Sequence, residues 1–263
     1  MTSRQKNSKS PSDFSCASCL VNSLCLATGS FDHQTFAAID GIIERKKNYQ
    51  KASIIYKAGD ELKNLYAIRS GGVKIYSINE HGEEQITSFH MPGDLIGFDA
   101  IADNRHQSFA QTLETSNICE IPFEPLMRLA SRYPDMNLRL LKLISAEISV
   151  KKNLMMMISK QTAEQRLATF IMHLSDNLKR RNLSGNEIKL PMTRYEIGNY
   201  ISLTVETISR LLSRFQQKQI ISVKGKYIKV KYITQLLVND LHHAPFSMEG
   251  MESLCAEVFD VSI

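Results

Sequence analysis

The hydrophobic pattern is most regular between Pro134 and Lys160, where apolar residues recur at alternating steps of three and four. Pro134 can open a helix, because its missing N–H would be unpaired in the first turn anyway. Neither Pro nor Gly follows before Gly185. The pattern predicts one long helix over residues 134–160 with a narrow apolar seam, the spacing of a helix that packs on a copy of itself. The seam positions are Leu141, Ile144, Ile148, Lys151, Met155 and Ile158.

Lys151 is the charged position of this predicted seam. In a dimer it would face its own copy, and like charges at close range repel. Exclusion of water would add a burial penalty. The seam therefore predicts a weak dimer. The alternative is a core helix on which Lys151 extends its amine to solvent, and the helix alone favours neither interpretation.

Residues 51–123 follow a different pattern, in which β-branched and aromatic runs alternate with turn residues such as Pro92-Gly93. This alternation is typical of a small antiparallel β-barrel or jelly roll. A short amphipathic helix is expected before it, within residues 31–45. The clearest predicted strands are 65–69, 73–78, 85–89 and 117–121.

Two short helical patterns near the C-terminal end predict a helix-turn-helix. Thr193 and Glu196 have the spacing of a capping box, which opens a helix over residues 194–201. Thr204 opens a second helix over residues 205–217. Two short helices joined by a brief turn place the second one as a DNA recognition helix.

The outer face of this second helix carries the residue types that read bases. Arg bonds guanine bidentately, Glu accepts from cytosine, and Ser serves either base. The basic tip of a tight hairpin at residues 223–229 predicts a wing that contacts phosphate. The alternative is an ordinary helical hairpin with a solvated charged face. The candidate DNA contacts are Thr204, Glu206, Ser209, Arg210, Arg214, Lys224 and Lys226.

Charge supports the DNA-binding interpretation. The chain has a net charge of +5, and residues 179–232 hold twelve Lys or Arg against three acidic residues. Such a basic block predicts a polyanionic partner. The polar N-terminus lacks the apolar run of a signal peptide. The longest apolar cluster, residues 154–158, is too short to span a bilayer, so we expect a cytoplasmic protein with no membrane partner.

The cysteines point to metal chemistry. In a reducing compartment they are poor disulfide candidates, and three thiolates within ten residues can converge on one soft metal centre. Cys119, in the predicted strand 117–121, would clamp the N-terminal arm onto the barrel if it shared that centre. Unremarkable free thiols and a redox dithiol remain alternatives, although no βαβ pattern adjoins the Cys-x-x-Cys pair. We assign no role to Cys255. The three clustered cysteines are Cys16, Cys19 and Cys25.

The order of cysteine-rich arm, small β-barrel, long helix and winged helix-turn-helix resembles the cyclic-AMP receptor protein/FNR superfamily of bacterial transcription regulators. Within it, the chain resembles the FNR branch, named after fumarate and nitrate reduction. The resemblance covers roughly residues 14–230. The stretches that carry it are IERKK at 43–47, KAGDELK at 57–63, LYAIRSG at 65–71, GFDAI at 97–101, CEIPFE at 119–124, IGNY at 197–200 and LTVETISRLL at 203–212.

The resemblance implies an α+β fold with a cyclic-nucleotide-binding-like sensor barrel. It also implies that cluster loading without oxygen promotes dimerisation and DNA binding, which activates or represses genes of anaerobic metabolism. The implied partners are palindromic double-stranded DNA, RNA polymerase and a second copy of the chain. The FNR seam commonly carries an acid where this chain has Lys151, so the sign differs while the self-repulsion is kept. The implied ligands of an oxygen-labile [4Fe–4S] cluster are Cys16, Cys19, Cys25 and Cys119, and the implied readers of a TTGAT-type half-site are Glu206, Ser209 and Arg210.

From these observations we expect five segments. They are a cluster-binding arm at 1–30, a sensor barrel at 31–133, a dimerisation helix at 134–160, a winged helix-turn-helix at 161–234 and a C-terminal extension at 235–263.

Other functions can be built on this fold. Nucleotide-binding relatives supply a Glu and an Arg in the phosphate cassette, whereas here Phe98 follows Gly97 and residues 107–109 contain no Arg. A buried phosphate without its cation would be costly, and Arg105 is the nearest candidate cation. Structural zinc on the four cysteines would leave the DNA-binding half unchanged. No Ser/His/Asp set, phosphate-binding Gly-rich loop or carboxylate pair indicates an enzyme, so we expect no small-molecule substrate.

Overall fold

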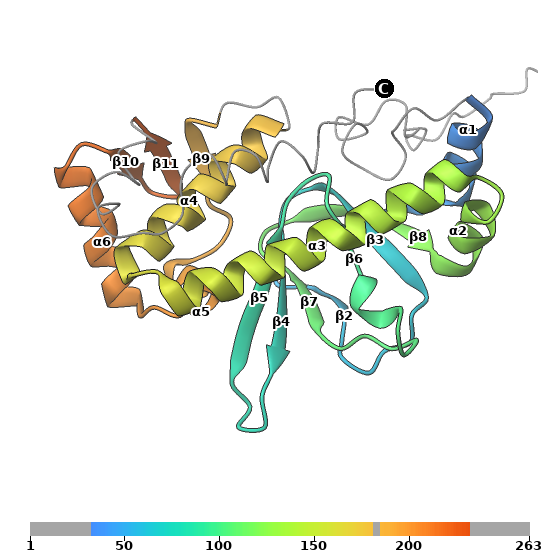
Figure 1. Cartoon of the computed structure of the whole chain (residues 1–263), viewed down its shortest axis with the longest axis horizontal. Coiled ribbons are helices and arrows are strands. Elements are labelled where there is room, and N and C mark those ends of the chain that lie inside the picture. Colours follow the sequence, from blue (N-terminus) through green and yellow to red (C-terminus); the bar gives the residue numbers. More distant parts are fainter. Residues whose placement is uncertain (1–32, 181–184, 232–263) are drawn as a thin grey trace, which may run out of the picture. The chain divides into compact units, whose positions relative to one another are not determined.

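A computed structural model of the chain describes residues 33–180 and 185–231. Most of their helices and strands are labelled in Figure 1. The described residues form two compact units. The first unit comprises 33–155 and 191–202, and the second comprises 156–180, 185–190 and 203–231. The predicted α+β class is confirmed.

Two antiparallel four-stranded sheets form the barrel of the first unit (Figure 1). One sheet has the strand order β1-β8-β3-β6, and the other β2-β7-β4-β5. Apolar side chains of both sheets, including Ile68, Val73 and Ile118, form a buried cluster. At the turn between β3 and β4, Gly71 has a φ of 89°, and a Cβ there would collide with Ser116. The strands are β1 (Glu44–Tyr49), β2 (Ile54–Tyr56), β3 (Asn64–Ser70), β4 (Val73–Ile78), β5 (Glu84–His90), β6 (Leu95–Ile96), β7 (Phe109–Thr112) and β8 (Ser116–Pro122).

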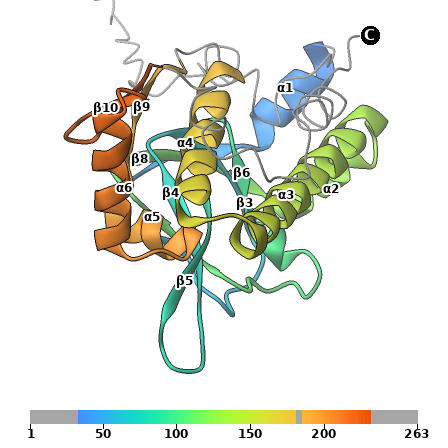
Figure 2. The same ribbon diagram turned by 60° about the vertical axis from the view of Figure 1, so that its left-hand side comes forward.

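Three helices cover one end of this barrel. Figure 2 shows α1 (His33–Ile42) beside α2 (Phe123–Ala130), with the start of α3 (Pro134–Lys160) close by. Their buried residues share one apolar cluster with the sheet of β3 and β8. The cluster therefore joins the barrel directly to the first turns of α3. Its helical members are Ile39, Leu126, Ala130, Met136 and Leu140.

The second unit contains α4 (Ala163–Arg180), α6 (Val205–Gln217) and a three-stranded sheet of order β10-β11-β9. The sheet consists of β9 (Glu187–Lys189), β10 (Ile221–Lys224) and β11 (Tyr227–Val230). The predicted hairpin is therefore present as β10 and β11. The four residues of α6 predicted to face inward are all buried, which confirms the assignment of its faces: Ile208, Leu211, Leu212 and Phe215.

Helix α5 (Arg194–Ile201) belongs to the first unit, although the sequence pairs it with α6. Its predicted capping box is present, because Thr193 Oγ1 accepts from the Glu196 N–H and the Glu196 carboxylate accepts from the Thr193 N–H. Ser202 ends the helix in the left-handed region, with a φ of 56°. The chain then reaches the first residue of α6, Val205, within three residues.

Two local predictions differ from the structure. The helix expected within residues 31–45 ends at Ile42, and the charged run Glu44–Tyr49 is a strand that pairs with β8. Pairing with an available strand outweighs local helix preference, which is weak. Strand β9 was not among the predicted strands, and it pairs with β11 through Ile188 and Ile228.

Candidate DNA-binding, dimer and metal sites

Helix α6 presents the polar face expected of a recognition helix. Thr204 caps it, with Oγ1 accepting from the Thr207 N–H at 3.2 Å. Burial of the opposite face leaves Glu206 and Arg210 exposed and Ser209 half-buried. A Glu, a Ser and an Arg on one side of the first two turns can reach base edges in a major groove.

Arg214 forms an ion pair with a carboxylate of the same unit. Its Nη1 lies 2.7 Å from Oε2 of Glu164 on α4, and Lys218 Nζ lies 3.3 Å from the other carboxylate oxygen. The ion pairs join α6 to α4 within the second unit. No local signal in the sequence indicates this role, because Glu164 lies far away in the chain. A DNA contact of Arg214 stays a prediction.

The wing carries exposed cations at its tip. Lys224 pairs with Tyr227 at the end of the two strands, and Lys226 lies in the turn beside Gly225. A hydrogen bond from the residue after β9 holds the turn, because the Leu190 N–H donates to the Lys226 carbonyl at 2.8 Å. The backbone of the tip is thus fixed while both lysine side chains remain exposed, an arrangement suited to phosphate contacts.

The seam of α3 contains large apolar side chains exposed in the single chain. Leu141, Ile148 and Met155 are 58%, 62% and 71% exposed, and they are spaced seven residues apart. Ile144 and Ile158, on the alternate positions of the repeat, are half-buried. Exposed apolar residues at heptad spacing favour a partner helix of the same kind. The assignment of individual seam contacts stays a prediction.

Lys151 has a partner on its own helix. Its Nζ lies 3.5 Å from Oε1 of Glu147, one turn earlier, while the Lys151 side chain remains 52% exposed. A nearby opposite charge reduces the net positive charge that the seam would present to a second copy.

Cys119 lies on the strand face that packs toward the helices. It shares a face of β8 with Ile121, which belongs to the apolar cluster of Met136 and Leu140 of α3, and Cys119 packs against that cluster. Cys16, Cys19 and Cys25 lie outside the described residues. Residues 33–180 and 185–231 alone hold no group of three or more potential metal-ligating side chains. Four cysteine thiols are nevertheless a donor set suited to an iron–sulfur cluster, and the half-buried site of Cys119 fits one of its ligands.

A buried polar network occupies the segment that corresponds to a nucleotide phosphate cassette. Gly97, with a φ of 104°, precedes the turn η2 (Phe98–Ala100), and Phe98 packs against the apolar cluster. The Asp99 carboxylate accepts from the Gln107 N–H at 3.0 Å and from the Ser108 hydroxyl at 2.7 Å. These donors are therefore already engaged by an internal anion.

His106 completes this network. Its ring stacks on Tyr56 with centroids 3.7 Å apart, and its Nδ1 lies 3.1 Å from Asp99. Burial raises the pKa of Asp99, but the hydrogen bonds from His106 and Ser108 outweigh it, so that the pKa falls below its ordinary value. The nearest predicted cation, Arg105, donates instead to the Gly59 carbonyl at 2.7 Å. The sequence pattern does not reveal the network, because its members come from strand β2, the turn η2 and the segment before β7, which are separated in the chain.

A sensor-type barrel, a long helix with an exposed heptad seam and a winged helix-turn-helix together define a DNA-binding transcription regulator. Residues 46–133 match the cyclic nucleotide-binding domain family, and residues 165–237 match the Crp-like helix-turn-helix domain family. The chain belongs to the family of fumarate and nitrate reduction regulators, FNR, and is a transcription regulator of that type.

The comparisons behind this assignment cover most of the chain. The chain is 51% identical to the fumarate and nitrate reduction regulatory protein of Yersinia pestis, over 82% of this chain and 86% of that protein. It is 50% identical to the anaerobic regulatory protein of Haemophilus influenzae, over 84% and 86%.

Solved structures agree with the fold. FixK2 from Bradyrhizobium japonicum covers 77% of this chain and 100% of its own, with a TM-score of 0.70 at 25% identity. A mutant of CooA from Carboxydothermus hydrogenoformans has a TM-score of 0.62 at 19% identity, over 80% of this chain and 91% of its own. Within the described ranges, no helix combines the length and apolar character needed to cross a bilayer.

Proposed function

We propose that this regulator responds to oxygen through a [4Fe–4S] cluster held by Cys16, Cys19, Cys25 and Cys119. When bound, such a cluster supplies iron–sulfur chemistry that oxygen disrupts. The observation that carries the proposal is that Cys119 packs against the apolar cluster of Met136 and Leu140. A ligand residue in this cluster is tied by packing to the first turns of α3, the helix with the exposed seam.

The output of the regulator is a dimer that reads a palindrome. A two-fold dimer presents two recognition helices to two half-sites. Glu206, Ser209 and Arg210 read a TTGAT-type half-site, and the wing lysines contact phosphates. RNA polymerase is the partner at activated promoters. The protein acts in the cytoplasm by binding rather than by catalysis.

The test is an anaerobic purification followed by exposure to air. The parent protein should be brown, contain about four irons per chain, and bind a TTGAT palindrome. Air should bleach the colour and weaken DNA binding together. Cys119→Ser should lose iron and DNA binding, whereas the matched Cys255→Ser should keep both. A colourless parent protein that carries zinc would refute the cluster and leave the DNA-binding half of the proposal.

Cyclic nucleotide is the second candidate ligand, because residues 46–133 match the nucleotide-binding family. The buried network argues against it. A phosphate in this cassette would face the Asp99 carboxylate, and the donors of Gln107 and Ser108 already serve that carboxylate. Like charges at such distances repel strongly in a partly buried site. Calorimetry with cyclic AMP should show no binding, and tight binding would reverse this choice.

A further inference from the structure

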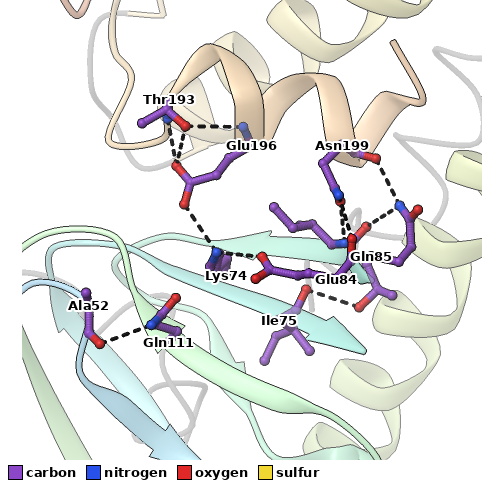
Figure 3. Close-up of polar contacts among 11 residues, drawn as sticks. Ala52, Lys74, Ile75, Glu84, Gln85, Gln111, Thr193, Glu196 and Asn199 are labelled. Carbon is purple, nitrogen blue, oxygen red and sulfur yellow. Dashed lines mark hydrogen bonds and ion pairs between the residues drawn. The ribbon is translucent and has the colours of Figure 1, made fainter. Parts of the chain in front are cut away.

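Helix α5 is attached to the barrel through the edge of β5 (Figure 3). In the described part of the chain, β5 is the terminal strand of its sheet. The side-chain amide of Asn199 pairs with this edge in both directions. Its Oδ1 accepts from the Ile86 N–H at 2.6 Å, and its Nδ2 donates to the Glu84 carbonyl at 2.6 Å. The amide thus satisfies one donor and one acceptor, as a neighbouring strand would.

Two further contacts join the same strand and helix. Gln85 Nε2 donates to the main-chain carbonyl of Asn199 at 2.9 Å. The rings of Phe89 and Tyr200 meet edge to face, with centroids 5.1 Å apart. The strand therefore contacts α5 through its backbone, a polar side chain and an aromatic side chain.

A buried cation ties the start of α5 to the barrel as well. Lys74 on β4 is 7% exposed, and its Nζ lies 2.6 Å from Glu84 and 3.4 Å from Glu196 (Figure 3). Glu196 also accepts from the Thr193 N–H in the capping box of α5. One carboxylate thus both caps the helix and compensates Lys74. Loss of either acid would leave a buried charge less well paired.

We infer that the β5 edge is a docking site that positions the DNA-reading module, with Asn199 as its central positioning residue. Three residues separate α5 from α6, so the docked α5 limits how far the start of the recognition helix can move from it. Two recognition helices of a dimer must match half-sites about 34–36 Å apart. A fixed anchor on the barrel would therefore set the half-site spacing that the dimer accepts. This inference rests on palindrome binding in the proposed function.

The test measures spacing preference in the full-length, cluster-loaded protein. Fluorescence anisotropy under anaerobic conditions would compare a palindromic duplex of natural spacing with duplexes one base pair longer or shorter. Asn199→Ala should bind the natural duplex roughly five- to tenfold more weakly while losing most of the preference for its spacing. Iron content and the dimer fraction should match those of the parent, because Asn199 is neither a cluster ligand nor a seam residue.

Two variants keep the test decisive. Gln85→Ala removes one contact from an exposed side chain and should shift the spacing preference in the same direction by a smaller factor. Asn153→Ala removes an exposed amide from α3, away from the predicted seam, and should bind as the parent does. An unchanged spacing profile in both Asn199→Ala and Gln85→Ala would overturn the inference. Tighter binding by Asn199→Ala would also overturn it, because it would identify the contact as inhibitory.

The parent protein separates failure of this inference from failure of the proposed function. If the parent shows no preference for a palindrome, the proposed function fails and this inference fails with it. If the parent discriminates spacing and the Asn199 and Gln85 variants discriminate equally well, only the docking inference is wrong.

Discussion

Replacing Lys151 should strengthen the dimer and allow it to persist without the cluster. In the single chain, the Lys151 amine lies 3.5 Å from the Glu147 carboxylate of the same helix. In a dimer, two such pairs would lie across the seam from each other. The dimer therefore experiences repulsion between the amines, repulsion between the carboxylates, and attraction between each amine and the opposite carboxylate.

The magnitude follows from the geometry of paired helices. Packed helix axes lie about 8–10 Å apart. Two amines separated by about 9 Å would repel by about 2 kcal/mol at an effective dielectric constant of about 20. Glu147 lies outside the predicted seam, so each attraction between an amine and the opposite carboxylate acts over a longer distance and is reduced by salt screening. If the two attractions together offset about half of the repulsion between the amines, about 1 kcal/mol remains. Lys151→Ala should therefore tighten dimerisation about fivefold, since about 1.4 kcal/mol corresponds to tenfold.

Two other substitutions, Lys151→Glu and Glu147→Gln, should weaken the dimer, in contrast to Lys151→Ala. Lys151→Glu places a second acid beside Glu147, so that each copy presents two negative charges. Glu147→Gln removes the charge that compensates Lys151. Lys142→Ala is the matched control, since Lys142 is an exposed lysine on the same helix but outside the predicted seam.

The assay is sedimentation velocity on the aerobic, cluster-free protein over a range of concentrations. Raising the salt concentration should reduce the differences among the variants, because salt screens exposed charges. The reasoning is refuted if Lys151→Ala remains as monomeric as the parent. It is also refuted if Lys142→Ala produces the same gain, because general loss of positive charge would then explain the result.

Three further results are expected. Arg210→Ala should cost about 1–3 kcal/mol on the palindrome and relax specificity at one base pair, measured by anisotropy on a set of single-base variants. Lys226→Ala should weaken specific and random duplexes alike and lower the slope of log affinity against log salt by about one. Asp99→Asn should destabilise the barrel in urea titrations at neutral pH by about 1–3 kcal/mol, because hydrogen bonds from Ser108 and His106 then meet a poorer acceptor. Since the pKa of Asp99 is lowered on folding, its contribution is present above the ordinary carboxyl pKa of 3.8 and is lost as pH falls through the lower folded value. A destabilisation by Asp99→Asn that is equally large in strong acid would contradict this account.

The helical elements could be predicted well because their signals are local. The long helix, α5 and α6 have the predicted bounds, Pro134–Lys160, Arg194–Ile201 and Val205–Gln217. Periodicity extends over several turns in the first, and capping residues mark the start of the other two. The buried face of α6 follows from the same periodicity. Such information is contained within a few consecutive residues.

The roles of several charged residues depend on partners far away in the chain. Lys74, in the predicted strand 73–78, is buried between Glu84 and Glu196. Arg214 is a predicted DNA contact, and in the structure it also pairs with Glu164. A period-two or period-3.6 pattern records whether a position faces the core. It does not record which distant carboxylate compensates a cation there.

Apolar and polar contacts contribute differently to the position of α5 on the barrel. Ile197 and Ile201 are the buried apolar residues of the helix. Apolar burial is non-directional, so it allows a helix to slide or rotate over a surface at modest cost. The two bonds of Asn199 to the β5 backbone and the bridge from Glu196 to Lys74 are directional. They are satisfied only at one register of α5 along β5, and for that reason the polar side of the helix, rather than its buried side, determines where α5 is held on the barrel.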